Sequence, residues 1–410
     1  MPGLPIRRNT ALLSAAMALN SATFQLVAAV SSITFVLVTG IESLLGLGPA
    51  IFMLSTAAGA LVAGRAMDRL GRVPVIAAGF GTAAIGSALT ALGAGTDSAL
   101  AIVCGFALLG AGGGAVNLSR TAAGDMYPPS RRARGIAWVL FGAVFGAILG
   151  PAVFSPIFAG RELDADALVV PWLASSGIAL LGIAVVLLVR PDPKRIAELI
   201  TLTADGAEPE RVAPAPLGTI LRRPGVVPAL VAGLASVAVM VAVMNLTGYV
   251  VVEHRHHQQH LVFPIIGAHV VGMFGLMPVV GSFVDRIGRA PALVGGLVLI
   301  AVSCAGLQWG ESVWATGALL FGLGLGWNVS FVAATAQLVD LSAPSERGKL
   351  LGFHDFAGSI LGAAFVLLGG YALDELGVYA LAAGSAVAAL VPVVFLVTRP
   401  RAPRPAPEAA

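Results

Sequence analysis

Apolar segments about twenty residues long recur along the whole chain, and they narrow the possible folds more than any other feature. The segments are uninterrupted, whereas the strands of a membrane barrel alternate polar and apolar residues over about ten positions. Only 11% of the residues are charged and 57% are hydrophobic, while a soluble domain carries about a quarter charged residues. So few polar side chains cannot cover a surface in water. The sequence therefore predicts an all-α membrane protein.

Twelve of these segments are long enough to cross a bilayer as helices. They comprise residues 11–39, 44–64, 74–94, 98–122, 135–158, 168–189, 225–250, 261–282, 291–309, 312–336, 349–371 and 377–397. An even number of spans places both chain ends on one side of the membrane. Of the 24 Lys and Arg residues, all except Arg161 and Arg255 fall on or near that side. Because basic residues accumulate in cytoplasmic loops, we expect a multi-pass protein of the plasma membrane, in a bacterium the inner membrane, with both termini cytoplasmic.

Two short motifs each occur twice. GRAMDRLGRVP at 64–74 and GSFVDRIGRAP at 281–291 share six of eleven positions at an offset of 217. DMYPPSRRARG, starting at Asp125, and DLSAPSERGKLLG, starting at Asp340, match at an offset of 215. Such a repeat indicates duplicated halves of six helices each, in the same orientation. The predicted domains are two pseudo-symmetric six-helix bundles, a cytoplasmic linker and a disordered tail, at residues 1–190, 224–398, 191–223 and 399–410.

The D-R-x-G-R sequence in each copy of the first motif is predicted to lie in the short cytoplasmic turn between the second and third helices of its half. The glycines of the motif suit a tight turn and its proline suits a helix start. Its arginines anchor the topology, but that role does not explain an aspartate at the same place in both copies. A carboxylate favours the positive end of a helix dipole and accepts backbone N–H bonds. We therefore expect an aspartate of one half to bind a helix start of the other half and to close the cytoplasmic side.

These features together resemble the major facilitator superfamily of secondary transporters over essentially the whole chain. Gly64-x-x-x-Asp68-Arg69-x-Gly71-Arg72 is similar to the cytoplasmic loop signature of that family, although Val73 replaces its usual basic residue. The resemblance implies that Asp68 contacts the start of helix eleven and that Arg72 links it to Asp125, with a weaker copy in the second half. The predicted gating residues are Asp68, Arg69, Arg72, Asp125, Asp285, Arg286, Arg289 and Asp340.

The resemblance also implies that helices one, four, seven and ten line a central cavity. Polar and aromatic residues lie in those segments, and we expect them to bind substrate. They are Asn20, Gln25, Asn117, Asn245, Tyr249, Trp327 and Asn328. The alternative for each is a hydrogen bond between helices, which contributes about 0.6 kcal/mol.

Span five carries Gly142, Gly146 and Gly150 at intervals of four, followed by Pro151. This spacing predicts close helix packing. It also resembles the fifth-helix signature of proton-coupled drug exporters, although that signature ends in a glycine pair that is absent here. The run therefore favours export.

Ionisable residues near the bilayer centre cost about 2.5–3.5 kcal/mol on insertion scales, so they are candidates for function. His269 in span eight, with His354 and Asp355 in span eleven, are the predicted proton-coupling residues. Histidine changes its charge near neutral pH. The alternative for His269 is a neutral imidazole bonded to a carbonyl. Arg120 is expected to pair with Asp125 or with a lipid phosphate.

The predicted function is secondary active transport by alternating access, with proton-coupled efflux of a small hydrophobic or amphipathic compound. The alternatives are a symporter or facilitator that imports a nutrient, and a membrane sensor that transports nothing. No phosphate-binding loop or catalytic motif is present, so we expect no enzyme and no cofactor. The expected partners are a small-molecule substrate, protons and membrane lipid, without nucleic acid, and we expect a monomer. The histidine-rich loop at 253–260 has no fixed ligand spacing, which favours a solvated loop over a metal site.

Overall fold

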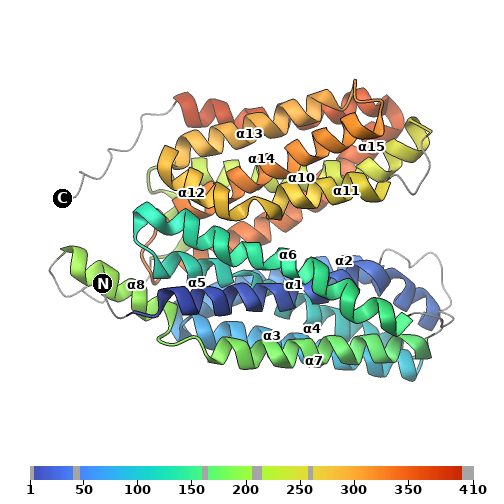
Figure 1. The fold of residues 1–410 in the computed structure, drawn as a ribbon, viewed down its shortest axis with the longest axis horizontal. Coiled ribbons are helices and arrows are strands. Elements are labelled where there is room, and N and C mark those ends of the chain that lie inside the picture. Colours follow the sequence, from blue (N-terminus) through green and yellow to red (C-terminus); the bar gives the residue numbers. More distant parts are fainter. Residues whose placement is uncertain (1–3, 40–46, 159–164, 206–214, 257–261, 399–410) are drawn as a thin grey trace.

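The computed structural model describes residues 4–39, 47–158, 165–205, 215–256 and 262–398, and the regular elements within these ranges are helical. Figure 1 shows two layers of long helices lying side by side. The first layer and the linker contain α1 (Ile6–Thr39), α2 (Leu47–Leu70), α3 (Arg72–Gly95), α4 (Ala99–Asn117), α5 (Ser119–Met126), α6 (Arg132–Phe158), α7 (Val169–Leu187), α8 (Pro193–Asp205) and α9 (Leu217–Leu221). The second contains α10 (Val226–Tyr249), α11 (Val262–Val270), α12 (Met277–Ile287), α13 (Arg289–Gly306), α14 (Val313–Asp340) and α15 (Arg347–Thr398).

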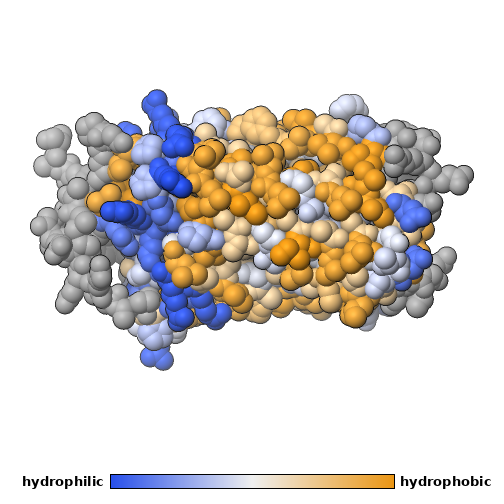
Figure 2. Space-filling view, turned by 90° about the horizontal axis from the view of Figure 1, so that it is seen from below, coloured by the Kyte–Doolittle hydropathy of each residue, from blue (hydrophilic) through white to orange (hydrophobic). Residues whose placement is uncertain are grey.

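The described residues form eleven helices long and apolar enough to span a membrane, or twelve when one bent pair is counted as a span. Figure 2 shows a wide apolar band with hydrophilic residues gathered toward the ends of the molecule. The predicted all-α fold with twelve spans is confirmed. The start of α1 and the end of α15 lie at the same end of the bundle (Figure 1). We call this end, which carries the repeated motifs, the charged end.

Two spans contain breaks, and a third break separates two spans within α15. The eighth consists of α11, a π-helical segment Val271–Gly275 and α12, with a bend of 49°. The fourth consists of α4 and α5, which meet at Leu118. α15 contains the eleventh and twelfth spans, and its backbone leaves the helical region at Gly377, where φ is 77°. π-helical segments and broken helices often occur at functional sites.

The repeated motif folds more tightly than expected. Asp68 belongs to the last turn of α2 and Arg72 is the first residue of α3, so the connection contracts to Gly71, with φ of 98°. Gly288 has φ of 94° at the equivalent place. Glycine adopts this backbone conformation without a steric penalty. The expectation that the whole D-R-x-G-R sequence lies in a turn is therefore wrong: α2 continues beyond its apolar part because Asp68 is buried between the two layers.

Glycines bring helices into close contact within and between the layers. A Cβ added at Gly142 or Gly146 would collide with the α1 backbone, and one at Gly150 would meet the Gln25 side chain. The side chain of Pro151 lies outside the described residues. Between the layers, Gly64 of α2 faces the Gly348 backbone of α15 and Gly281 of α12 faces the Ala133 backbone of α6. These last two glycines occupy equivalent positions of the first motif.

Candidate functional site

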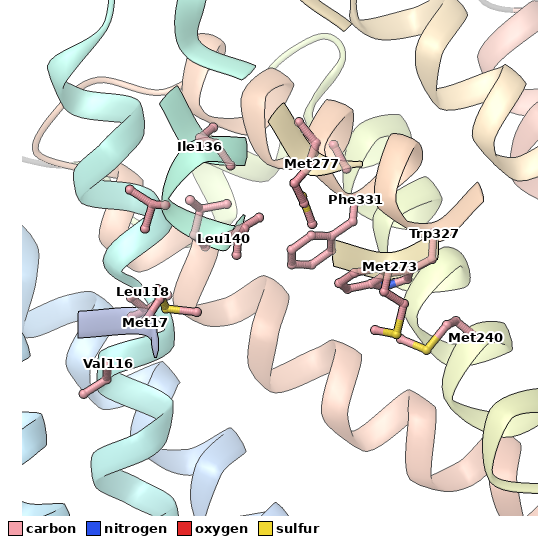
Figure 3. Packing of buried hydrophobic residues seen from close by; sticks show 14 of the residues in the cluster. Met17, Val116, Leu118, Ile136, Leu140, Met240, Met273, Met277, Trp327 and Phe331 are labelled. Carbon is pink, nitrogen blue, oxygen red and sulfur yellow. The ribbon is translucent and has the colours of Figure 1, made fainter. Parts of the chain in front are cut away.

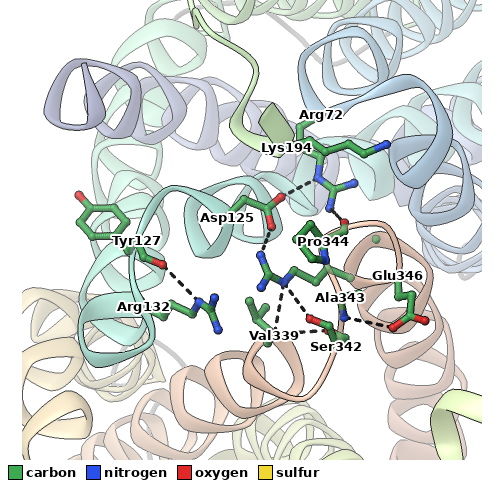
Figure 4. Close-up of polar contacts among 12 residues, drawn as sticks. Arg72, Asp125, Tyr127, Arg132, Lys194, Val339, Ser342, Ala343, Pro344 and Glu346 are labelled. Atoms are coloured by element: carbon green, nitrogen blue, oxygen red, sulfur yellow. Dashed lines mark hydrogen bonds and ion pairs between the residues drawn. The ribbon is translucent and has the colours of Figure 1, made fainter. Parts of the chain in front are cut away.

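One buried polar cluster joins the two layers at the charged end. Both carboxylate oxygens of Asp68 accept backbone N–H bonds at the start of α15, from Gly348 at 2.9 Å and Lys349 at 2.7 Å. Arg72 is fully buried; its Nε lies 2.7 Å from Asp125 and its Nη2 donates to the carbonyl of Pro344 at 2.6 Å. Figure 4 shows the Arg72 guanidinium between Asp125 and Pro344. The start of α15 is thus held by charge-assisted bonds from the other layer.

Asp125 bridges the layers within this cluster. Its Oδ2 accepts from Arg72 and its Oδ1 accepts from Nη1 of Arg347 in the opposite layer, at 2.6 Å. The Nε of Arg347 also donates to the carbonyls of Val339 and Ser342. A buried ion pair stabilises only when its remaining donors are satisfied, and here the guanidinium groups reach backbone oxygens as well as carboxylates. We call Asp68, Arg72, Asp125 and Arg347 the first cluster.

The second cluster repeats these contacts with the layers exchanged. Asp285 of α12 accepts from the backbone N–H groups of Ala133 at 3.2 Å and Arg134 at 2.9 Å, at the start of α6. Arg289 bonds to Asp285, Asp340 and the carbonyl of Pro129, and Arg132 of the opposite layer bonds to Asp340. We call Asp285, Arg289, Asp340 and Arg132 the second cluster.

The two clusters are related residue by residue through the sequence repeat. Three pairs match at the offset of 215: Asp125 and Asp340, Arg132 and Arg347, and Pro129 and Pro344, whose carbonyls accept from the arginines. Two predicted gating residues take no part: Arg69 and Arg286 are exposed at the charged end. The structure therefore brings six of the eight predicted residues together in two equivalent clusters.

The linker is attached to both layers beside the first cluster, at the start of α3 and directly before α15, which sequence reasoning missed. Asp192 accepts N–H bonds from Arg72 at 2.9 Å and Val73 at 2.8 Å, so it caps α3. At the other end of the linker, Arg223 pairs with Glu346, directly before α15. Asp192 could have been recognised in the sequence RPDPK as a capping residue, but its partner helix lies 119 residues away along the chain.

A third ion pair joins the layers further from the charged end. Arg120 of α5 bonds to Asp355 of α15, and Nδ1 of His354 lies 3.2 Å from the same carboxylate. The expectation that Arg120 pairs with Asp125 or a lipid phosphate is wrong, because Asp125 is occupied by two other arginines. His354 is 1% exposed and its Nε2 has no hydrogen-bond partner among the described residues. We call Arg120, His354 and Asp355 the central triad.

Aromatic side chains lie beside the central triad, and methionines lie beside these aromatic side chains. The rings of Trp327 and Phe331 on α14 stack, with centroids 4.7 Å apart and an angle of 17° between their planes. The Arg120 guanidinium lies over the Phe331 ring of this pair, 4.8 Å from the ring centroid. Figure 3 shows Met240 and Met273 beside Trp327 in the second layer, opposite Met17 and the aliphatic residues of the first layer. Trp327, Phe331 and the neighbouring methionines thus form an apolar wall, with the Arg120 guanidinium against one of its rings.

The remaining predicted substrate-binding residues are distributed unevenly. Asn20 donates to Asn117 at 2.9 Å, which matches the alternative of a hydrogen bond between helices. Asn328 is buried and donates to the carbonyl of Gly272 in the π-helical segment, while its Oδ1 has no partner among the described residues. Gln25 packs against Gly150. Asn245 is exposed and bonds within α10. The side chain of Tyr249 lies outside the described residues.

His269 does not join the central triad. It is fully buried in α11, and its Nδ1 lies 2.9 Å from the carbonyl of Leu320 in α14. This is the geometry of the alternative for His269, a neutral imidazole that holds two helices together. In the histidine-rich loop, His257 and His260 lie outside the described residues, and the described part of the chain contains no cluster with the ligands of a metal ion.

Comparison with known proteins identifies the scaffold. The sequence model of the Major Facilitator Superfamily matches residues 11–277 and 252–410. The chain belongs to the major facilitator superfamily. It is 31% identical to the riboflavin transporter RfnT of Brucella anthropi over 85% of each chain. The fold is similar to the proton:xylose symporter XylE, with a TM-score of 0.76 and 15% identity over 95% of this chain and 96% of that one.

A second solved structure, the E. coli fucose:proton symporter FucP, gives a TM-score of 0.74 at 16% identity, over 96% of this chain and 98% of that one. At this identity the likeness concerns the fold alone. The resemblance to the superfamily inferred from the repeated motifs is thus confirmed. The chain is a multi-pass membrane transporter for small molecules, and it is not an enzyme, since members of this family move solutes without converting them.

Proposed function

We propose that this superfamily member couples proton movement to the transport of a small, planar, largely apolar compound by alternating access. The observation that carries the proposal is the central triad: an ion pair between the layers, with a buried histidine beside it, next to a stacked aromatic pair. In this account the two clusters at the charged end form gates that hold one mouth closed. The triad links substrate binding to the state of those gates.

The proton would act on the contact between Arg120 and Asp355. Protonation of Asp355 removes the negative partner of Arg120 and weakens a bond that joins the layers. His354 can share the proton, because its Nδ1 faces the same carboxylate and its Nε2 has no partner among the described residues. His269, bonded to a carbonyl, is the weaker candidate for coupling.

The substrate class follows from the wall beside the triad. The stacked rings of Trp327 and Phe331 offer apolar area to a flat ring system, and methionines adapt to irregular shapes. The Arg120 guanidinium lies over the Phe331 ring of this wall, so a compound with a planar, electron-rich or weakly acidic ring fits best. The relative named as a riboflavin transporter is consistent with such a substrate.

Efflux is the direction favoured by the glycine run in α6, and uptake is a second candidate. The run also has a role in packing, because Gly142 and Gly146 lie against the α1 backbone within one layer. The pH gradient separates the two directions. When the solution outside is more acidic than the solution inside, a proton antiporter expels the compound and a proton symporter accumulates it.

Purified protein in proteoliposomes tests the proposal. We expect a pH gradient to drive flux of a flavin or a similar planar compound, and Asp355→Asn to abolish the pH drive while leaving exchange of the compound across the membrane. The matched control is Asp97→Asn, an exposed aspartate outside the triad. Equal pH-driven flux in wild type and Asp355→Asn would contradict the coupling site. Absence of any flux in wild type would favour the non-transporting sensor.

The charged end is proposed to face the cytoplasm, since all but two of the basic residues lie on or near that side. We propose a monomer in the inner membrane of a bacterium, surrounded by lipid. Labelling of Leu70→Cys with an impermeant thiol reagent checks the orientation. Leu70 is 69% exposed at the end of α2, and it is expected to react from the cytoplasm alone.

A further inference from the structure

A large cavity among the described residues lies away from the central triad. It occupies about 1420 Å³ at the charged end, between the first half of α1 and the first half of α6, with Ile200 of α8 at its edge. Typical small-molecule pockets measure about 300–1,000 Å³. The cavity does not include the central triad or the stacked rings. We call it the α1/α6 groove.

Arginines line the mouth of the groove. They are Arg7, Arg8, Arg131 and Arg134, and the lining contains no acidic side chain among the residues that the structure describes. Two of them have protein partners: Arg8 donates to the carbonyl of Leu188, and Nε of Arg134 donates to Ser282. The side chains of Arg7 and Arg131 are exposed and have no hydrogen-bond or ion-pair partner among the described residues. Two free guanidinium groups therefore face one opening.

Beyond the arginines the walls of the groove are mostly apolar, and several of their side chains are exposed on the surface of the helix bundle. On α6 a row of rings runs away from the arginines, from Trp138 through Phe141 to Phe145, each ring edge-on to the next at 5.9 and 5.3 Å. Trp138 is 43% exposed and Phe145 is 53% exposed. The opposite wall on α1 has small residues, including Ala11 and Ala15. A Trp close to arginines and followed by apolar rings is typical of the border between lipid head groups and acyl chains.

We propose that the α1/α6 groove is a binding site for one anionic phospholipid of the adjacent leaflet. The phosphate of the lipid would bind Arg7 and Arg131, and one acyl chain would lie along Trp138, Phe141 and Phe145. Charge complementarity selects an anionic head group, because each basic side chain near the surface contributes about 1 kcal/mol. The length of the aromatic row selects a ligand with an acyl chain over free phosphate. The site does not depend on the proposed substrate or on proton coupling.

Native mass spectrometry of the full chain in detergent tests the site. Phosphatidylglycerol and phosphatidylcholine with identical acyl chains are titrated separately. We expect wild type to bind one phosphatidylglycerol at least about tenfold more tightly than phosphatidylcholine. In Arg7→Gln/Arg131→Gln the affinity for phosphatidylglycerol should fall about thirtyfold, as two lost basic contacts require, while phosphatidylcholine binding is unchanged.

The control for lost charge is Arg65→Gln/Arg222→Gln, which removes two exposed arginines outside the groove and should bind like wild type. The second variant is Ala15→Trp, which fills the groove from its exposed α1 wall and should weaken both lipids. Equal binding of the two lipids by wild type, or equal loss in the control, would overturn the proposal. So would displacement of the lipid by millimolar inorganic phosphate, since that would indicate a site for free anions.

Discussion

At the scale of single residues, the aspartates at the charged end derive their effect from where their acceptor atoms point. Asp68 is 5% exposed and directs both carboxylate oxygens to N–H groups that a helix start cannot satisfy internally. Asp285 does the same for the start of α6. The favourable helix dipole and the bonds themselves act together, so each contact favours the arrangement in which the layers meet.

Asp68→Asn keeps the size of the side chain but replaces one acceptor oxygen by an amide and removes the charge. A hydrogen bond to a charged group contributes about 1.5–3 kcal/mol, so we expect transport to fall at least about tenfold, with normal insertion into the membrane. The control is Asp97→Asn, which is exposed with φ of 49°, a conformation that Asn tolerates. Flux of the Asp68→Asn protein in proteoliposomes at the wild-type rate would contradict the gate.

Glu346, just before α15, gives a prediction for pH. Burial raises the pKa of its carboxyl, but bonds from Arg223 and from the N–H groups of Ala343 and Ala215 outweigh burial and place the pKa below its ordinary value of 4.5. The ionised form therefore stabilises the fold above about pH 4.5, and this contribution is lost as the pH falls through the lowered pKa. We expect Glu346→Gln to lower Tm by a few degrees at pH 7.

That difference in Tm between wild type and Glu346→Gln should shrink as the pH falls below about 4. Thermal unfolding in detergent, followed by tryptophan fluorescence from pH 7 to pH 3.5, measures it. Glu198→Gln serves as a control, because Glu198 is exposed on α8. A difference in Tm that stays constant over this range would show that the ion pair with Arg223 does not set the pKa.

At the scale of helices, contact between the layers depends on glycines one turn before each aspartate. A Cβ on Gly64 would collide with the carbonyl of Gly348, and a Cβ on Gly281 would meet Ala133 and Ala137. These glycines let α2 and α12 approach the opposite layer closely enough for Asp68 and Asp285 to reach backbone N–H groups. The repeated G-x-x-x-D spacing therefore has a geometric cause, one helical turn between the close contact and the acceptor.

Gly64→Ala should separate α2 from α15. An added methyl group in a tight interface costs about 1–3 kcal/mol, so we expect the closed arrangement to become about ten times less populated. Ala60→Cys, whose site is 1% exposed in the same interface, should then react faster with a thiol reagent. Unchanged reactivity would contradict the role of this glycine.

The matched substitution is Gly295→Ala on α13, where an added Cβ meets no atom within 4 Å. It should leave the reactivity of the introduced cysteine unchanged. The two native cysteines, Cys104 and Cys304, are replaced by serine and alanine respectively in every protein compared. The comparison then isolates the close contact at Gly64 from the general effect of losing a helical glycine.

In the molecule as a whole, the features that occur in both halves could be predicted from the sequence. Contacts that occur in one half alone could not. The twelve spans followed from apolar length, and the two clusters followed from matched pairs such as Asp125 and Asp340. The pairing of Arg120 with Asp355 joins residues 235 apart and has no copy in the other half. Periodicity carries no information on such a contact, because it depends on how the finished layers face each other.

The helix ends show the same limit. Apolar length ended the second span at residue 64, but α2 continues to Leu70, because Asp68 in its last turns is buried against the opposite layer. Asp192 was missed for a related reason, since only the folded linker brings it to the N–H groups of α3. The local sequence pattern therefore predicts the helices. The site depends on contacts between charged residues that lie far apart along the chain, and these could not be predicted in the same way.

The central claim is that two equivalent aspartate contacts hold the layers together at the charged end. Spin labels on Leu70→Cys and Ile287→Cys, at the exposed ends of α2 and α12 in opposite layers, report the separation of the layers by pulsed electron paramagnetic resonance. We expect one short distance in wild type and an added, longer population in Asp68→Asn/Asp285→Asn. Identical distance distributions in the two proteins would contradict it.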